Sequence, residues 1–361
     1  MTDKSKVIIA IGGTGGHVFP GCSLATHLAE KKFYIRMITD KRGYKYLEKF
    51  KHFDITILPS YSVFKKNIFL SVISLIFLFI SILRSLIFLI LNRPSIIFGM
   101  GGYASFPICI AASILRIKFI IYENNLIIGK ANKYLLPFAE KIFVSCKELE
   151  GISKKYQNKV VEIGNIIKKD IINFSSKSTI KDKNGKINIL ILGGSQAAKV
   201  FAEKLPKIFL KCINQDINLK IIQQCMPAQN ESLSSLYKNN KIDFEIFNFS
   251  DNLIKYFFQT DLAITRSGSS MLAELTNANI PFISVPLPSS ADNHQLKNAL
   301  FYHKKKLSYL IEEKDLNERL FNLVKEIYEN KSLMSNIRQN QKQFSDKNVY
   351  NNIDREIRNY L

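Results

Sequence analysis

The segment that most constrains the fold of this chain runs from Val7 to Pro20. Four apolar residues are followed by glycines at 12, 13, 15 and 16, and then by apolar residues at helical spacing. A strand, a tight glycine loop and a helix produce this pattern, and the first amides of such a helix attract anions. The segment therefore predicts an α/β domain whose first loop binds a phosphate group.

The residues around this loop leave several readings open. The dinucleotide fingerprint G-x-G-x-x-G is only partly met, because Val18 stands where the third glycine belongs. Asp40, after a predicted strand at 34–39, has the place of a ribose-binding acid, so a nicotinamide enzyme is one reading. His17 is either a cap of the helix or a proton acceptor and phosphate contact.

A second copy of the pattern begins at Ile187, where an apolar strand leads into the glycine loop Gly193–Gln196 and a helix. Alternating strands and helices indicate parallel sheets. We therefore expect an α/β fold of two Rossmann-like domains that face each other across a cleft. Further strands are predicted at 54–59, 95–98, 118–122, 141–145 and 160–165, and at 219–223, 243–247, 262–265 and 281–285.

The predicted domain bounds follow from composition. Residues 1–168 form the N-terminal domain, the polar stretch 169–185 is the linker, and 186–340 form the C-terminal domain. A C-terminal helix within 341–361 remains, and packing back on the N-terminal domain is one arrangement for it. A chain of 361 residues with 47% apolar and 22% charged residues has room for two globular cores.

The net charge of +21 predicts an anionic partner. The lysines are scattered rather than clustered, which argues against nucleic acid and favours an anionic membrane surface or a phosphorylated substrate. The five cysteines are odd in number and lie in apolar surroundings, as core residues of a reducing compartment do. No zinc spacing is present. The first six residues lead directly into a predicted strand, so we expect no secretory signal and a cytoplasmic location.

The segment 69–91 is almost entirely Ile, Leu and Phe. It is long enough to span a bilayer, but Arg84 lies within it and the strands on both sides belong to one predicted sheet. Serines at 71, 74, 81 and 85 share one stripe of a helix. We expect a crossover helix whose serine face packs on the sheet and whose apolar face meets an anionic membrane. A transmembrane span and a wholly buried helix are the alternatives. Four cations are available to head groups: Lys65, Lys66, Arg84 and Arg93.

The second half carries further polar motifs. Thr265–Ser270 follows a predicted strand and opens a helix, so its amides and hydroxyls predict a second phosphate cradle. Glu274, one turn into that helix, faces either a ribose diol or solvent. Asp292–Gln295 is either a polar cluster at the same end of the sheet or a helix cap. Because no Asp-x-Asp pair occurs, a transferase of this layout would neutralise a leaving diphosphate with helix termini and cations.

Six motifs occur in one order along the chain. They are Gly12-Gly-Thr-Gly-Gly-His-Val-Phe-Pro20, Gly99-Met-Gly-Gly-Tyr103, Glu123-Asn-Asn125, Gly193-Gly-Ser-Gln196, Arg266-Ser-Gly268 with Glu274, and His294-Gln295 before Asn298-Ala299. In this order they resemble the MurG family, the peptidoglycan N-acetylglucosaminyltransferases of the GT-B fold. The resemblance extends from Lys6 to about Lys305.

The resemblance implies that the N-terminal domain receives lipid I, undecaprenyl-diphosphate carrying N-acetylmuramoyl-pentapeptide, and that the C-terminal domain holds UDP-N-acetylglucosamine. It implies no cofactor and no metal. Lys168 stands where the family usually has an arginine, which keeps the charge but loses the bidentate fork. Tyr122 stands where it often has a histidine. Substrate-binding roles are implied for Thr14, Gly15, Gly16, Asn125, Lys168, Ser195, Ser250, Ser269, Ser270, Met271, Leu272, Ala273, Glu274 and Gln295.

The leading hypothesis is an inverting transferase that moves N-acetylglucosamine to the C4 hydroxyl of the muramoyl sugar, giving lipid II at the cytoplasmic face of the inner membrane. His17 is the first candidate for the base and Glu123 the second. Helix termini at Ser195 and at 267–270, with Lys168, would stabilise the diphosphate. The rival hypotheses are a UDP-N-acetylglucosamine 2-epimerase of the same fold and a non-catalytic nucleotide-sugar binding protein at the membrane.

Overall fold

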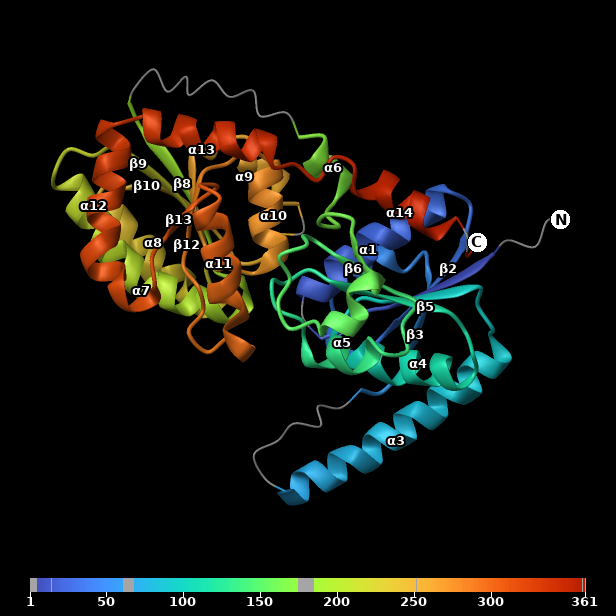
Figure 1. Cartoon of the computed structure of the whole chain (residues 1–361). Helices are drawn as coiled ribbons and strands as arrows, with labels where there is room; N and C mark the ends of the chain where they lie inside the picture. Colours follow the sequence, from blue (N-terminus) through green and yellow to red (C-terminus); the bar gives the residue numbers. More distant parts are fainter. Residues whose placement is uncertain are drawn as a thin grey trace. The chain divides into compact units, whose positions relative to one another are not determined.

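The computed structural model describes residues 5–13, 15–60, 68–174, 185–250, 252–358 and 360, without the side chains of 68–72 and 195–198. The chain divides into two compact units (Figure 1). The first unit comprises Met1–Lys168 and Asp346–Leu361, and the second comprises Lys169–Ser345. Each unit is built around its own parallel sheet, which confirms the predicted class of two Rossmann-like α/β domains.

The sheet of the first unit has seven parallel strands in the order β3-β2-β1-β4-β5-β6-β7. Strands β2 and β3 lie on one side of β1, and β4 and the later strands lie on the other side, so the strand order reverses between β1 and β4. In open α/β sheets, ligands bind at such a switch point. The strands are β1 (Lys6–Ala10), β2 (Tyr34–Thr39), β3 (Asp54–Ile57), β4 (Ile96–Gly99), β5 (Phe119–Glu123), β6 (Lys141–Val144) and β7 (Val160–Glu162). The helices are α1 (Gly15–Glu30), α2 (Lys41–Tyr44), α3 (Ile68–Leu91), α4 (Gly102–Ile114), α5 (Lys130–Leu135) and α14 (Val349–Ile357).

The sheet of the second unit has six strands, β10-β9-β8-β11-β12-β13, in the same order as the first sheet without β7. Its strands are β8 (Ile187–Leu192), β9 (Leu219–Gln224), β10 (Asp243–Phe247), β11 (Leu262–Thr265), β12 (Phe282–Ser284) and β13 (Tyr309–Leu310). Its helices are α6 (Lys169–Ile172), α7 (Gly194–Ile213), α8 (Asn230–Asn239), α9 (Ile254–Phe257), α10 (Ser269–Asn277), α11 (His294–Lys304), α12 (Leu316–Glu329) and α13 (Ser332–Gln343). The predicted linker thus begins as the helix α6, which packs on α10, and residues 175–184 lie outside the described part.

The central strands are continuous apolar runs because helices cover both of their faces. Val7 and Ile9 in β1, and Ile189 and Ile191 in β8, are fully buried. The core of the second unit joins these strands to α7, α8 and α12. The core of the first unit joins its strands to α4 and α5. These cores hold the carboxyl ends of the strands, and the loops that follow them, in fixed positions.

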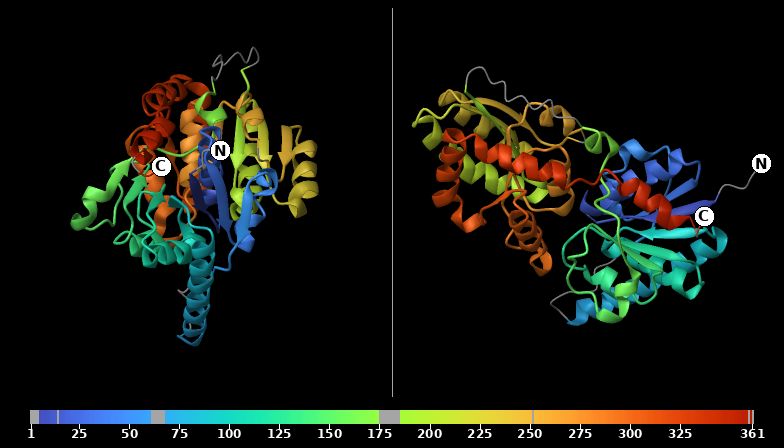
Figure 2. Two further views of the ribbon diagram at one scale, coloured as in Figure 1. Left: turned by 90° about the vertical axis from the view of Figure 1, so that its right-hand side faces the viewer. Right: turned by 45° about the horizontal axis from the view of Figure 1, so that its top comes forward.

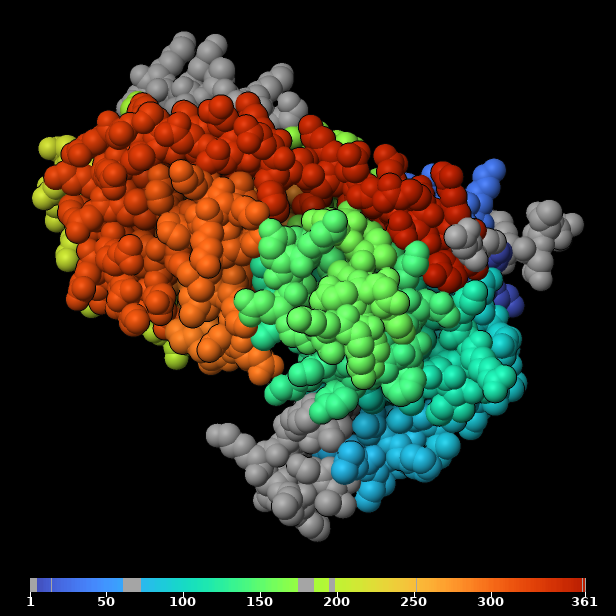
Figure 3. Space-filling view, viewed as in Figure 1, coloured from blue at the N-terminus to red at the C-terminus, as the bar shows by residue number. Residues whose placement is uncertain are grey.

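Helix α3 has two different faces. Ser74, Ser81 and Ser85 are buried, which confirms the serine stripe for these three residues, while Ser71 lies outside the described side chains. On the other face Ile76 is 56% exposed and Phe79 is 61% exposed, so the alternative of a wholly buried helix is wrong. The helix packs mainly on α4 rather than on the sheet, while Leu89 near its C-terminal end belongs to the core that includes the strands. It lies at the outside of the first unit (Figures 2 and 3).

Part of α3, Ile73–Leu91, is long and apolar enough to cross a membrane when length and composition alone are considered, with a mean hydropathy of 2.6. The helix connects β3 to β4, and both strands are parallel members of one sheet. The chain therefore returns to the same end of the sheet after α3, as a crossover helix does.

Helix α14 is held on the first unit by a buried histidine. Nε2 of His27 lies 2.7 Å from Oδ1 of Asp354, and Nζ of Lys31 lies 3.0 Å from its other oxygen. The Tyr350 ring lies 4.5 Å from the His27 ring, and its hydroxyl donates to the carbonyl of Ile167 at 2.6 Å. Burial alone would raise the pKa of Asp354, but the hydrogen bonds from His27 and Lys31 lower it.

We expect Asp354→Ala to lower the free energy of unfolding by about 1–3 kcal/mol, because it leaves the buried His27 without this partner. A carboxylate whose pKa is lowered by folding stabilises the fold above its ordinary pKa, and this stabilisation is lost as the pH falls through the lowered value. Urea unfolding is measured at pH 7 and then at stepwise lower pH down to pH 3. The free energy of unfolding of wild type and variant should therefore differ most at pH 7 and converge in acid. Asn351→Ala, at an exposed site of α14, is the control. Equal stability of the two variants at pH 7 would contradict this role.

Candidate active site

Loops after three strands meet at the carboxyl edge of the first sheet. His17 lies in the first turn of α1, and its ring faces the loop after β4 so closely that a β-carbon on Gly101 or Gly102 would come within 3.0 or 3.3 Å of it. Both glycines have positive φ, +90° and +75°. Only glycine combines this backbone conformation with so close an approach. The half-buried imidazole is therefore positioned by two loops.

Asn124 joins the loop after β5 to the same place. Its Nδ2 donates to the carbonyl of Gly16 at 3.1 Å, and the residue is only 5% exposed. Sequence reasoning assigned no role to Asn124, although it lies directly after a predicted strand and within the motif Glu123-Asn-Asn125. The hydrogen bond connects Gly16, one of the predicted substrate-binding residues, to the segment that carries Glu123.

Glu123 is held by four donors. Oε1 accepts from the N–H of Asn125 at 3.1 Å and from its Nδ2 at 3.0 Å. Oε2 accepts from the N–H of Gly129 at 2.9 Å and from Nδ2 of the buried Asn132 at 3.0 Å. A carboxylate has about four lone-pair sites, so these contacts leave Glu123 little capacity to accept a substrate proton. The geometry favours a positioning role for Glu123 and leaves His17 as the better candidate base.

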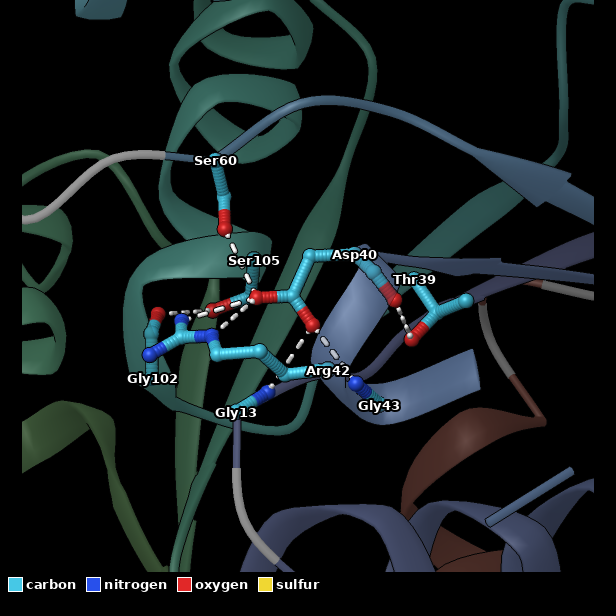
Figure 4. Close-up of polar contacts among 8 residues, drawn as sticks. All are labelled: Gly13, Thr39, Asp40, Arg42, Gly43, Ser60, Gly102 and Ser105. Atoms are coloured by element: carbon cyan, nitrogen blue, oxygen red, sulfur yellow. Dashed lines mark hydrogen bonds and ion pairs between the residues drawn. The ribbon is translucent and has the colours of Figure 1, made fainter. Parts of the chain in front are cut away.

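The carboxylate oxygens of Asp40 accept hydrogen bonds from four residues of the first unit (Figure 4). Asp40 accepts from the N–H of Gly43 at 2.8 Å and of Gly13 at 3.3 Å, from the hydroxyl of Ser60 at 2.9 Å, and from Arg42 at 2.8 Å. A ribose-binding acid needs free oxygens for a diol. The reading as a nicotinamide enzyme, which depended on Asp40, is therefore not supported.

In the second unit Gln295 connects the loops that follow β11 and β12. Its Oε1 accepts from the N–H of Ser267 at 3.1 Å and from the N–H of Leu287 at 3.0 Å. The side chain of Ser267 is fully buried, so its hydroxyl does not face the surface as the predicted cradle required. The side-chain oxygen of Gln295 thus holds the backbone that leads into α10.

Helix α10 begins after Gly268, which has no side chain to cap it. Leu272 and Ala273 are buried in the core, so any substrate contact of these two residues involves the backbone alone. Ser269 is 5% exposed, whereas Ser270, Met271 and Glu274 are half-buried. Of the predicted set, Glu274 has a charged side chain within reach of solvent one turn into the helix.

Arg266, which directly precedes Ser267 in the motif Arg266-Ser-Gly268, makes contacts within the second unit. It is 6% exposed, forms an ion pair with Glu313, and lies 4.7 Å over the ring of Phe201. Its Nη1 also donates to the carbonyls of Val285 and Pro286, each at 3.3 Å. These contacts tie the loop after β11 to the loop after β12.

The remaining predicted residues are spread over both units. Gly15 starts α1, and the ammonium group of Lys168 lies 5.9 Å over the ring of Phe19 in that helix. Ser250 lies in the loop after β10, where its hydroxyl donates to the carbonyl of Asn252 at 3.0 Å. Thr14 and the side chain of Ser195 lie outside the described part. In that part no group of three or more His, Cys, Asp and Glu residues could hold a metal ion.

Family models match most of the chain. Residues 7–144 match the glycosyltransferase family 28 N-terminal domain, and residues 188–353 match the glycosyltransferase family 28 C-terminal domain. A UDP-N-acetylglucosamine–N-acetylmuramyl-(pentapeptide) pyrophosphoryl-undecaprenol N-acetylglucosamine transferase from Pelagibacter ubique strain HTCC1062 is 35% identical over 355 residues, 98% of each chain.

Solved structures share the fold. MurG from Acinetobacter baumannii has a TM-score of 0.78 at 22% identity, covering 98% of this chain and 99% of that one. A UDP-N-acetylglucosamine 2-epimerase has a TM-score of 0.66 at 11% identity, covering 99% of this chain and 97% of that one. Both likenesses concern the fold, which is GT-B. The chain belongs to glycosyltransferase family 28. Within it the chain belongs to the MurG family, as the six motifs predicted.

We expect Glu123→Gln to disturb the loop 123–132, because an amide group would have to face donors that now meet a carboxylate. The variant should lose about 1–3 kcal/mol of stability, and its KM for the acceptor should rise. In the variant, kcat/KM should fall on the acid side at the same pH as in the wild type, because another group is the base. A pH–rate profile measures this. If the acid limb disappears in a folded variant, Glu123 is the base.

Proposed function

We propose that this protein transfers N-acetylglucosamine from UDP-N-acetylglucosamine to the C4 hydroxyl of the muramoyl sugar of lipid I, with inversion at the anomeric carbon. The observation that carries the proposal is full-length membership of a family whose relatives are named for this reaction, combined with a duplicated glycine loop. The likeness to the 2-epimerase is restricted to the fold.

The acceptor belongs to the first unit in this proposal. The C4 oxygen attacks the anomeric carbon from the face opposite UDP while His17 takes its proton. The ring is held for this task by the loops after β1 and β4, and Asn124 fixes the neighbouring Gly16. Thr14, Gly15, Gly16 and Asn125 contact the substrate, and Glu123 orders the segment that presents Asn125.

The donor belongs to the second unit. The starts of α7 at Ser195 and of α10 at Ser269 and Ser270 stabilise the diphosphate through their amides and dipoles, and Lys168 adds a cation. Glu274 accepts hydrogen bonds from the ribose hydroxyls, and Ser250 lies near the uracil. Gln295 holds the backbone at Ser267, directly before α10, through the reaction.

The first unit also meets the membrane, on the cytoplasmic face of the inner membrane. The exposed face of α3 carries large apolar side chains and Arg84, while its serine face is buried. An apolar face with a basic rim suits an interface rich in anionic lipid. The helix lies along this surface, because both strands that it connects belong to one sheet.

A direct assay separates the three candidate activities. Purified protein is incubated with UDP-N-acetylglucosamine and a soluble lipid I analogue, and UDP and sugars are analysed. A transferase releases UDP and forms the disaccharide only when the acceptor is present. An epimerase changes the donor sugar without acceptor, and a binding protein changes neither. Absence of disaccharide from folded protein that binds both substrates would refute the proposal.

Replacing His17 by Ala should lower kcat by roughly 10² to 10⁴, the usual contribution of a positioned base. The affinity for UDP-N-acetylglucosamine should stay nearly unchanged, because His17 is proposed to contact the acceptor and not the donor. His52→Ala, at an exposed histidine, is the control and should behave as wild type. A fall of less than tenfold in the His17 variant would show that another group removes the proton.

Placing Asp at both Ile76 and Phe79 should release the protein from liposomes that contain anionic lipid, without unfolding it, because both side chains are exposed. Wild-type binding should weaken in salt but persist in part, since buried apolar area is not screened. Asp at Asn214 and Asn218 adds the same charge to exposed sites of the second unit and should leave flotation unchanged. Undiminished flotation of the α3 variant would contradict this surface.

A further inference from the structure

The chain between β7 and α6 is buried but irregular. Residues 163–168 belong to no helix or strand, and Asn165, Ile166 and Ile167 are only 5%, 2% and 2% exposed. Buried backbone groups need hydrogen-bond partners, and a segment outside helices and sheets takes many of them from side chains. Lys168, the cation of the proposed donor site, directly follows these residues. The contacts that hold the segment therefore determine where the backbone of Lys168 lies.

Tyr122, the fourth residue of β5, makes the central contact with this segment. Its hydroxyl oxygen accepts from the N–H of Ile166 at 3.0 Å, and the residue is 3% exposed. Burial raises the pKa of the Tyr122 phenol, although the hydrogen bond from Ile166 opposes this shift, so the hydroxyl is neutral at physiological pH. The backbone of Tyr122 is fixed as well, because its carbonyl accepts from Nδ2 of Asn132 at 2.9 Å. A rigid strand thus supplies the acceptor for the N–H of Ile166.

Two residues near the C-terminal end of the chain hold the neighbouring backbone groups. Oδ1 of Asp346 accepts from the N–H of Asn165 at 2.7 Å, and the hydroxyl of Tyr350 donates to the carbonyl of Ile167 at 2.6 Å. These two bonds lie on either side of the bond at Ile166. Side chains of the first unit therefore hold three consecutive residues of the segment.

The side chain of Lys168 is also placed by contacts within the first unit. Its ammonium group lies 5.9 Å over the ring of Phe19 in α1. Burial raises the pKa of the Cys22 thiol in the same helix to about 12, against the opposing effect of the nearby Lys168 charge. The lysine stem is flexible, so the position of the ammonium group depends on the backbone from which the stem starts.

We propose that Tyr122 is a positioning residue for Lys168: by holding the N–H of Ile166, its hydroxyl fixes the backbone from which Lys168 reaches the diphosphate of UDP. The inference rests on the proposed function, in which Lys168 contributes this cation. Without the hydroxyl, the buried N–H loses its acceptor, and the segment has to shift to find another. A misplacement of about 1 Å in a binding group can cost up to about 10² in rate.

A double-mutant cycle tests whether Tyr122 acts through Lys168. Calorimetry at low salt measures the UDP affinity of the wild type, Tyr122→Phe, Lys168→Ala and the double variant. Tyr122→Phe should weaken UDP binding about five- to tenfold when Lys168 is present, and less than about twofold in the Lys168→Ala background. In the Lys168→Arg background, which keeps the charge, the larger loss should return. Equal losses in all three backgrounds, or unchanged UDP affinity of Lys168→Ala, would overturn the proposal.

The matched control is Tyr237→Phe, which removes another buried phenol hydroxyl, one that donates to Oε1 of Gln223 in the second unit. Both substitutions should lower the midpoint of thermal unfolding by a similar amount, because each leaves a buried polar group without its partner. UDP affinity should fall only in Tyr122→Phe. If Tyr237→Phe weakens UDP binding equally, the effect is one of stability and the proposal is wrong. Wild-type protein that binds no UDP would instead refute the proposed function, before any variant is compared.

Discussion

A parallel sheet brings the carboxyl ends of all its strands to one edge, and the candidate catalytic and substrate-binding groups depend on that constraint. Because both sheets have the same strand order, each unit has a switch point between its first and fourth strands. The loops at these edges carry His17, Glu123 and Asn124 in the first unit, and the starts of α7 and α10 in the second. The apolar strands provide a rigid support, and in the proposed function the polar residues that follow them provide the chemistry.

The sequence was sufficient to predict most strands, because strands covered on both faces are continuous apolar runs. It missed β13, since a two-residue strand has no detectable period. The glycine loops were predicted for a physical reason as well, because few other residues combine positive φ with a close approach. The two faces of α3 followed from the spacing of its serines.

The side-chain network of the site was much harder to predict. Asp40 looked like a ribose-binding acid, and only the structure shows that its oxygens are taken by Gly13, Gly43, Ser60 and Arg42. Glu123 looked like a possible base until its four donors were known. Asn124 and Asn132 received no role, since the sequence does not show what a polar residue after a strand, or in a short helix such as α5, will contact. Long-range hydrogen bonds such as Asn124 to Gly16 depend on register and loop conformation, which periodicity does not report.

In the proposed function, the two glycine loops serve different substrates, and UDP binds at the second loop. Hydrogen exchange of the wild-type protein with and without saturating UDP measures this directly, because amides that bind a phosphate exchange more slowly. We expect slower exchange at 194–196 and 269–274, and unchanged exchange at 13–17. Slowing at 13–17 by UDP alone, as strong as that at 194–196, would contradict it.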